Sequence, residues 1–137
     1  MSHTPKRILV VDDHVDTALS FAALLRALGH EVEAVTDSMR VEARVAELEP
    51  HIVFLDIGMP RLDGIEAARQ LRRSHWPARL VFLTVHEDTD FARAALDAGG
   101  LGYVVKARLA SDLLPAIREA LADRRFISPT ISLEENA

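Results

Sequence analysis

The chain contains no cysteine, so disulfide bonds, thiol catalysis and zinc sites built from thiolates are excluded. It also lacks an excess of basic residues, because 16 lysines and arginines stand against 21 aspartates and glutamates and the formal net charge is -5. Proteins that bind nucleic acids carry a basic surface that neutralises phosphates, so we expect no direct nucleic-acid partner for this chain.

Long apolar runs are absent as well. Near the N-terminus only residues 8–11 form a continuous, strongly apolar run, which is too short for the core of a signal peptide. No later run approaches the ~20 apolar residues that a membrane-spanning helix needs. We therefore expect a cytoplasmic protein with no membrane partner.

What remains is the composition of one globular domain. The length of 137 residues matches the ~100–150 residues of a common single domain. Hydrophobic residues make up 49% and charged residues 27% of the chain, which suffices for a buried core without covalent staples.

Short β-branched apolar segments alternate with segments of helical spacing, five times in succession. The predicted strands are residues 7–12, 31–35, 52–56, 79–83 and 102–105. The first, third and fourth are almost continuously apolar, as strands covered on both faces are. The alternation predicts an α/β fold, a single doubly wound (βα)5 domain with a five-stranded parallel sheet and helices on both faces.

Apolar residues at intervals of three and four mark the helices between these strands. The predicted buried stripes are Val15, Leu19, Ala22 and Leu25; Val41, Val45 and Leu48; Ile65, Ala68 and Leu71; Phe91, Ala94, Ala95 and Ala98; and Leu114, Ile117 and Leu121. Gly29 is predicted to end the first helix, and Asp37 or Ser38 to cap the second. Ser111 is predicted to cap the last helix, with Pro115 in or near its first turn.

Charged and polar residues stand where the predicted strands end. Asp12 and Asp13 end the first strand, Asp56 the third and Thr84 the fourth, and Lys106 follows the fifth. In an open parallel sheet the carboxyl ends of the strands meet at one edge, where ligands bind. We expect these five side chains to converge there. Taken singly, each is more often a turn former, a solvated charge or an ordinary strand residue, and only their joint placement indicates a site.

Three crowded carboxylates repel one another, and a hard divalent cation removes the conflict. Mg²⁺ prefers oxygen ligands and keeps several waters, which suits one or two carboxylates, a backbone carbonyl and a phosphate oxygen. Phosphoryl transfer requires mainly positioning and neutralisation of charge. The pattern predicts Asp56 as the nucleophile, with a metal and Lys106 neutralising phosphoryl oxygens and Thr84 donating a hydrogen bond to one of them.

These residues lie in segments that resemble the receiver domains of two-component response regulators over residues 6–126, which leaves residues 127–137 as a C-terminal tail. The matching segments are ILVVDDH (8–14), VFLDIGMPRLDG (53–64), VFLT (81–84), AG (98–99) and GYVVK (102–106). The resemblance implies a flavodoxin-like strand order 2-1-3-4-5. It also implies a phosphoacceptor switch that assists its own phosphorylation and dephosphorylation, rather than an enzyme.

The resemblance assigns roles within the site. It implies Asp56 as the phosphoacceptor and Mg²⁺ as the cofactor, with Asp13 as a direct ligand, Asp12 as a ligand through water and the Gly58 carbonyl as a further ligand. Thr84 and Lys106 become the phosphoryl contacts.

Tyr103 would be the switch aromatic, whose ring turns inward when Thr84 moves toward the phosphoryl group. The alternative for Tyr103 is a half-buried strand aromatic with its hydroxyl in water.

The implied partner is a sensor histidine kinase or a phosphotransfer protein. Phosphorylation would switch the surface of the fourth helix, fifth strand and fifth helix, and a homodimer would use that surface or the first and fifth helices. Residues 124–129 resemble receivers that precede a helix-turn-helix output domain. The alternative function is therefore the input half of a DNA-binding transcriptional regulator whose output domain is absent from this chain.

Other interpretations meet specific obstacles. A phosphatase of the haloacid dehalogenase type needs a second acid two residues after the nucleophile, where this chain has Gly58. The glycines at 99–102 lead from a helix into a strand, the wrong order for a dinucleotide-binding turn. A receiver that is never phosphorylated is disfavoured by the complete acid set. Many relatives have a proline after the lysine, and with Ala107 in that place we expect a trans Lys106–Ala107 peptide.

Overall fold

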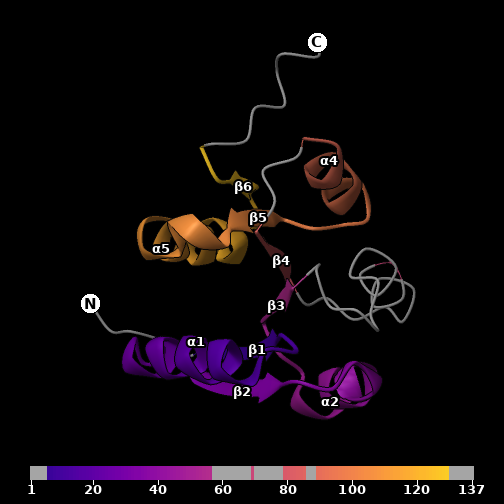
Figure 1. Cartoon of the computed structure of the whole chain (residues 1–137), viewed down its shortest axis with the longest axis vertical. Coiled ribbons are helices and arrows are strands. Elements are labelled where there is room, and N and C mark those ends of the chain that lie inside the picture. Colours follow the sequence, from indigo (N-terminus) through magenta and orange to yellow (C-terminus); the bar gives the residue numbers. More distant parts are fainter. Residues whose placement is uncertain (1–5, 57–68, 70–78, 86–88, 130–137) are drawn as a thin grey trace.

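The computed structural model describes residues 6–56, 69, 79–85 and 89–129. Within these residues the strands are β1 (Arg7–Val11), β2 (Glu31–Val35), β3 (Ile52–Asp56), β4 (Arg79–Thr84), β5 (Gly102–Val105) and β6 (Phe126–Ile127). They form one parallel sheet in the order β2-β1-β3-β4-β5-β6 (Figure 1). The predicted order 2-1-3-4-5 is confirmed, and the strand that follows β5 was not predicted.

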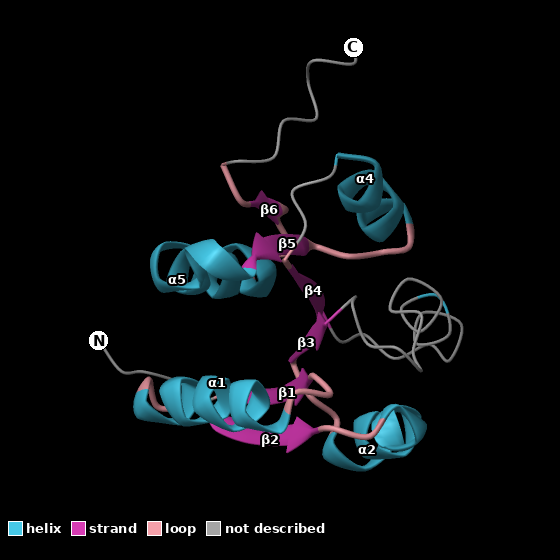
Figure 2. Cartoon of the chain, in the orientation of Figure 1, coloured by secondary structure: helices cyan, strands magenta, loops and turns pink. Residues whose placement is uncertain are grey.

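Helices cover both faces of this sheet. They are α1 (Val15–Ala27), α2 (Val41–Leu48), α4 (Thr89–Asp97) and α5 (Leu109–Leu121), with short 3-10 turns η1 (Ser38–Arg40) and η2 (Lys106–Arg108). Figure 2 shows α1 and α5 on one side of the sheet and α2 and α4 on the other. The predicted third helix lies outside the described residues. None of the helices that are described is long and apolar enough to cross a membrane.

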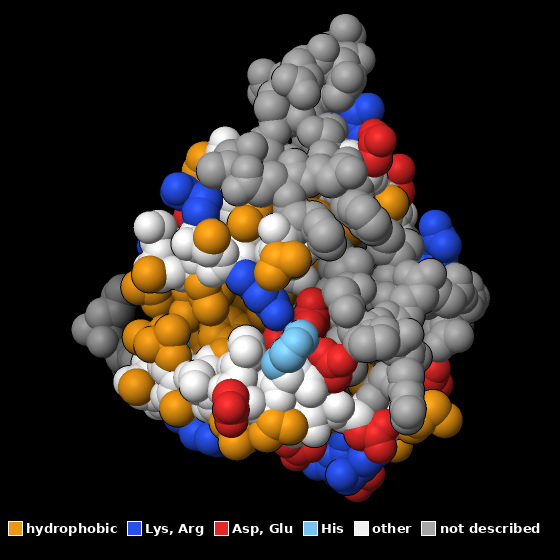
Figure 3. All heavy atoms as spheres, in the orientation of Figure 1, with side chains coloured by type: hydrophobic (Ala, Val, Ile, Leu, Met, Phe, Trp, Pro, Cys, Tyr) orange, Lys and Arg blue, Asp and Glu red, His pale blue; other side chains and the backbone are white. Residues whose placement is uncertain are grey.

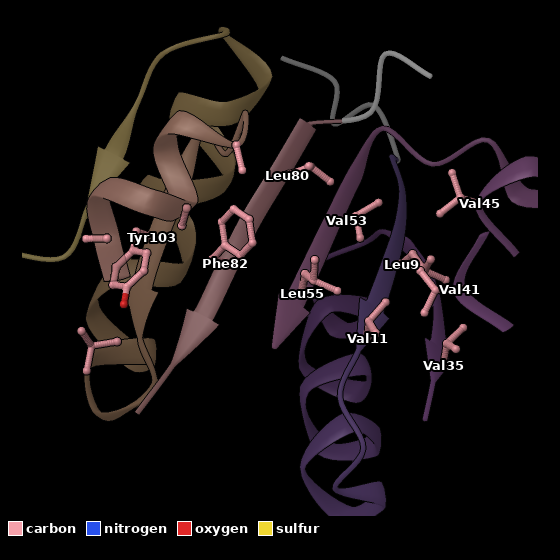
Figure 4. Packing of buried hydrophobic residues seen from close by; sticks show 14 residues of the cluster. Leu9, Val11, Val35, Val41, Val45, Val53, Leu55, Leu80, Phe82 and Tyr103 are labelled. Carbon is pink, nitrogen blue, oxygen red and sulfur yellow. The ribbon is translucent and has the colours of Figure 1, made fainter. Parts of the chain in front are cut away.

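Two hydrophobic clusters fill the space between the sheet and its helices. Successive side chains of a strand point to opposite faces, so Leu9 and Val11 enter one cluster while Ile8 and Val10 enter the other. The first cluster packs β1, β3 and β4 against α2 and α4 (Figure 4). Burial on both faces explains why β3 has no exposed residue and reads as a continuous apolar run.

The buried stripes of two helices differ from those predicted. In α1 the buried residues are Ala18, Phe21, Ala22 and Leu25, whereas Val15 and Leu19 are 53% and 54% exposed. In α5 Leu113, Ala116, Ile117 and Ala120 are buried, whereas Leu114 is 54% exposed. Both helices carry apolar residues in two overlapping helical registers, and packing against the sheet selects one of them.

The ends of the helices confirm part of the predicted capping. Gly29 follows α1 with φ 95°, a left-handed conformation that glycine adopts without steric cost. The Asp37 carboxylate accepts a 3.0 Å hydrogen bond from the Met39 N–H at the start of η1. The N-cap of α2 is Arg40, which makes no side-chain capping bond, so the prediction that Asp37 or Ser38 caps this helix is wrong. Ser111 is not a cap, because α5 begins at Leu109, directly after η2, and this earlier start also places Pro115 beyond the first turn.

A buried polar network joins β6 to the sheet and to α5. The Ser128 hydroxyl donates a 2.7 Å hydrogen bond to the Asp112 carboxylate and accepts a 3.0 Å bond from the Val105 N–H. The Ser128 N–H donates to the Tyr103 carbonyl at 2.9 Å, and the Arg108 guanidinium pairs with Asp112 at 3.1 Å. Ser128 is fully buried, although the sequence places it in the C-terminal tail.

The Ser128→Ala variant is expected to be less stable than the wild type by about 1–3 kcal/mol, because Asp112 and the Val105 N–H each lose a hydrogen-bond partner in a buried place. Urea unfolding followed by circular dichroism measures the difference. Ser20→Ala, at an exposed position of α1, is the matched control and should change the unfolding free energy by less than about 0.5 kcal/mol. Equal stability of the two variants would contradict the role of the network.

Two histidines support the amino end of β1. The Lys6 N–H donates to Nδ1 of His30 at 3.2 Å, and the Arg7 N–H donates to Nδ1 of His51 at 3.0 Å. Burial, followed by the charges of Arg7, Lys6 and Arg79, holds the pKa of His51 below its ordinary value of 6.5. Since Nδ1 must stay unprotonated to accept a hydrogen bond, the fold favours neutral His51.

The unfolded chain therefore binds a proton at His51 more readily than the folded chain does. Stability should fall as the pH drops below about 6.5 and level off once the pH is below the folded-state pKa. His51→Asn retains an acceptor but does not titrate, so its unfolding free energy should lose this part of the pH dependence. Urea unfolding between about pH 5 and 7.5 checks it, and an unchanged slope in the variant would refute it.

Candidate functional site

The site lies at the carboxyl edge of the sheet, where four strands end. Asp12 directly follows β1, Asp56 and Thr84 are the last residues of β3 and β4, and Lys106 directly follows β5. The parallel register, with Val11 beside Leu55, brings these ends to the same edge. The Asp12, Asp56 and Thr84 residues are 1%, 4% and 1% exposed. The structure thus gathers the residues that the sequence predicts.

Lys106 neutralises part of this buried negative charge. Its Nζ atom lies 2.9 Å from Oδ2 of Asp12 and 3.4 Å from Oδ2 of Asp56. One ammonium group therefore lies between two carboxylates that would otherwise repel each other.

The ionisation of Asp12 reflects these contacts. Burial by itself raises the pKa of Asp12, but the hydrogen bond from the His14 N–H and the Lys106 ammonium outweigh it and hold the pKa below 3.8. Burial likewise lowers the pKa of Lys106, and the carboxylates of Asp12 and Asp56 outweigh it and raise the pKa above 10.5. Both groups are charged at neutral pH.

Asp13 and His14 complete the cluster on its solvent side. Oδ1 of Asp13 is buried and accepts no hydrogen bond within the described part of the chain, while the side chain as a whole is 28% exposed. Nδ1 of His14 lies 3.3 Å from this oxygen and 3.4 Å from Oδ1 of Asp12. Acidic, basic and histidine side chains gather in the middle of the face that Figure 3 shows.

This donor set fits a divalent cation. Asp12, Asp13, His14 and Asp56 each offer a ligand atom, and these four atoms lie within 4.8 Å of one another. Lys106 balances one of the three negative carboxylate charges, and the two that remain match the charge of one divalent cation. The unsatisfied Oδ1 of Asp13 is an acceptor that such an ion would engage. Gly58, the further predicted ligand, lies outside the described residues.

The two residues that the sequence predicts as the switch are both inside the protein. Thr84 is 1% exposed, and Tyr103 is fully buried in the cluster that contains Phe82, Ala92 and Ala95. Figure 4 shows the Tyr103 hydroxyl pointing toward the end of the sheet at which β4 terminates. The interpretation of Tyr103 as a half-exposed strand aromatic is therefore wrong.

The link after Lys106 has an ordinary geometry. The Lys106–Ala107 peptide is trans, as expected for a residue other than proline. The chain enters η2 at Lys106, and the Lys106 ammonium reaches Asp12 and Asp56 at the carboxyl ends of β1 and β3.

Comparison with known proteins assigns the family. Residues 8–118 match the family model of the response regulator receiver domain. This chain belongs to that family. It is a receiver domain of a two-component response regulator and not a classical enzyme, and its fold and acidic cluster agree with that assignment.

Relatives and solved structures support the assignment. The receiver is 38% identical over 128 residues to the response regulator GacA of Pseudomonas viridiflava and 36% identical over 125 residues to the transcriptional regulatory protein PdtaR of Mycobacterium tuberculosis. These alignments cover 92% and 90% of this chain, and the chain spans 60% of the length of each relative.

Among solved structures, a two-component response regulator of the LuxR family from Aurantimonas sp. SI85-9A1 superimposes with a TM-score of 0.89 and 35% identity, covering 97% of this chain and 98% of that one. The chemotaxis response regulator CheY4 of Vibrio cholerae, at 22% identity and a TM-score of 0.79, covers 86% of this chain and is itself covered completely. The second likeness supports the fold alone.

Sequence reasoning missed one member of the site, His14. It predicted the acids and the lysine because these end strands, whereas His14 follows Asp13 and precedes α1. Its position next to two acids was the only signal in the sequence.

Lys106→Met is expected to destabilise the receiver by about 2 kcal/mol at pH 7, because buried Asp12 and Asp56 lose their shared cation. The low pKa of Asp12 contributes stability above about pH 3.8 that is lost as the pH falls through its folded-state value, so the difference between variant and wild type should shrink in acid. Urea unfolding in metal-free buffer at several pH values measures the difference in unfolding free energy between variant and wild type. Arg118→Met, at an exposed position of α5, is the control and should show no such difference.

Proposed function

We propose that this receiver accepts a phosphoryl group on Asp56 and thereby acts as the switch of a two-component phosphorelay. The observation that carries the proposal is the position of Asp56. Its carboxylate is buried at the end of β3, lies 3.4 Å from the Lys106 ammonium and belongs to a cluster that fits a divalent cation. The donor would be a phosphohistidine on a sensor histidine kinase or on a phosphotransfer protein.

Mg²⁺ is the cation that we assign to this cluster. Asp12, Asp13 and Asp56 would hold it, with the Gly58 carbonyl as a further ligand and Asp12 acting through water. Bound there, the ion would supply positive charge that neutralises phosphoryl oxygens and reduces the repulsion between an anionic donor and the carboxylates.

The protein's own groups have separate tasks in the transfer. A carboxylate oxygen of Asp56 attacks phosphorus, the new P–O bond forms, and the bond from phosphorus to the donor's imidazole nitrogen breaks. The Lys106 ammonium neutralises a phosphoryl oxygen, and the Thr84 hydroxyl donates a hydrogen bond to another. The phosphoryl group would take over the charge contacts that Lys106 makes with the carboxylates in the structure described here.

The output of the switch would be a rearrangement of Thr84 and Tyr103. Movement of Thr84 toward the phosphoryl group changes the packing next to the buried Tyr103 ring, and this ring lies in the cluster shared with α4. The two arrangements would present different α4-β5-α5 surfaces to a target, which is how a local charge selects between two packed states. A homodimer through this surface or through α1 and α5 is the assembly that we assign.

A second candidate function is the input half of a DNA-binding transcriptional regulator. Two facts favour it: the chain spans 60% of the length of its curated relatives, and one of these is named a transcriptional regulatory protein. The net charge of -5 indicates that DNA contacts would come from an additional domain.

Incubation with acetyl phosphate and Mg²⁺ tests the proposal. Intact mass spectrometry should show one added phosphoryl group, and peptide mapping should place it on Asp56. Asp56→Asn should abolish the modification. Removal of Mg²⁺ by a chelator should reduce its rate at least tenfold, because the loss of one electrostatic contact with the phosphoryl group typically costs about this much or more.

Asp37→Asn is the matched control, since Asp37 is an exposed carboxylate that does not belong to the cluster that fits a cation. It should be modified like the wild type. Absence of the modification in the wild type, or its persistence in Asp56→Asn, would overturn the assignment of Asp56.

A further inference from the structure

His14 occupies the N-cap position of α1 without acting as a cap. Its backbone has the extended geometry of an N-cap, with φ -82° and ψ 103°, yet its side chain makes no capping hydrogen bond. Residues at this position usually turn an oxygen toward the first N–H groups of the helix. The imidazole instead lies beside the carboxylates of the site.

The contacts of His14 fix the imidazole at the edge of the cluster. Its backbone N–H donates a 3.0 Å hydrogen bond to Oδ1 of Asp12, which ties the residue to the most buried acid. Its Nδ1 atom lies 3.4 Å from the same oxygen and 3.3 Å from Oδ1 of Asp13, the buried oxygen that accepts no hydrogen bond among the described residues. A ring nitrogen thus borders the place where a cation would meet the unsatisfied oxygen.

Distance and chemistry together indicate a ligand. A cation at about 2.0–2.6 Å from each donor can be shared by atoms that lie up to roughly 5 Å apart. The donor atoms of Asp12, Asp13, His14 and Asp56 lie within 4.8 Å of one another. Mg²⁺ prefers oxygen donors, whereas imidazole nitrogen is a good ligand for first-row transition ions.

We propose that His14 is a nitrogen ligand of this site, which gives the receiver a binding site for a first-row transition ion of the Zn²⁺ type in addition to Mg²⁺. The inference rests on the cation site of the proposed function and adds a ligand to it. The three carboxylates would serve both kinds of ion, while the imidazole would engage only the ion that accepts nitrogen.

A purely electrostatic role for His14 makes a different prediction. An imidazole that acted only through charge or through its hold on Asp12 would change the binding of every divalent ion to the same degree. A ligand changes the binding of one class and spares the other. The side chain of His14 is 71% exposed, so its replacement leaves the core of the fold intact.

Isothermal titration calorimetry with Zn²⁺ alone and with Mg²⁺ alone tests the proposal on wild type and His14→Gln. The variant should bind Zn²⁺ roughly tenfold more weakly or worse, and Mg²⁺ within about twofold of the wild type. In the wild type, Zn²⁺ should also shift the ¹⁵N resonances of the His14 ring in long-range ¹H–¹⁵N spectra, a signature that electrostatic proximity does not produce.

His30→Asn is the control for the other histidines. It removes an imidazole at the amino end of β1, and the asparagine can still accept the hydrogen bond from the Lys6 N–H. It should retain the wild-type affinity for Zn²⁺. Equal Zn²⁺ affinity in wild type and His14→Gln, or equal losses for both ions, would overturn the role of His14. If the wild type bound neither ion and Asp13→Asn showed the same absence of binding, the cation site of the proposed function would be contradicted as well. This outcome differs from the one that contradicts only the role of His14.

Discussion

The Lys106 ammonium, held between the carboxylates of Asp12 and Asp56, is the contact on which the site depends. It joins residues that are 94 positions apart, and only the parallel sheet brings them together. Lys106 follows β5, while Asp12 follows β1, with β3 and β4 in between. The long stem of a lysine can cross this distance along the carboxyl edge, and the ammonium at its tip supplies the charge that makes two buried acids compatible.

The same contact explains why the site is prepared for charged ligands. A buried carboxylate with its proton removed is costly unless a partner compensates it. Lys106 compensates enough to keep Asp12 ionised, as its lowered pKa shows, but it leaves an excess of negative charge at the cluster. The excess favours a cation, and the lysine favours an anion such as a phosphoryl group. A site that attracts both is suited to a reaction in which the two meet.

The fold and much of the site were predictable because short stretches of sequence mark each strand, and the same pattern recurs along the chain. Strands buried on both faces must be continuously apolar, so their ranges were readable, and the residues that end them, such as Asp56 and Thr84, necessarily share an edge. The register of α1 and α5 was not readable, since Val15 and Leu19 are as apolar as the residues that become buried. The place of the His14 imidazole beside Asp12 and Asp13, rather than in a capping bond to α1, is not encoded by spacing.

The sixth strand escaped prediction for a related reason. A segment of two residues, Phe126 and Ile127, is too short to show a period. The polar contacts that hold the chain beside it involve Ser128, Asp112 and Arg108, which lie on separate elements. These partners become visible only once α5 has been placed on the sheet. Sequence patterns indicate how each element is covered, whereas contacts between single polar residues far apart in the chain appear only in three dimensions.

The hydrogen bond from the Val105 N–H to the Ser128 hydroxyl has a mechanical consequence. Val105 directly precedes Lys106, so the polypeptide at Ser128 is fastened to the residue that carries the lysine. Because the Ser128 hydroxyl also bonds to Asp112 of α5, a displacement of the chain at this point would act on helix α5 and on the backbone next to Lys106 together. The position of Ser128 is thus coupled to the end of β5, from which Lys106 follows.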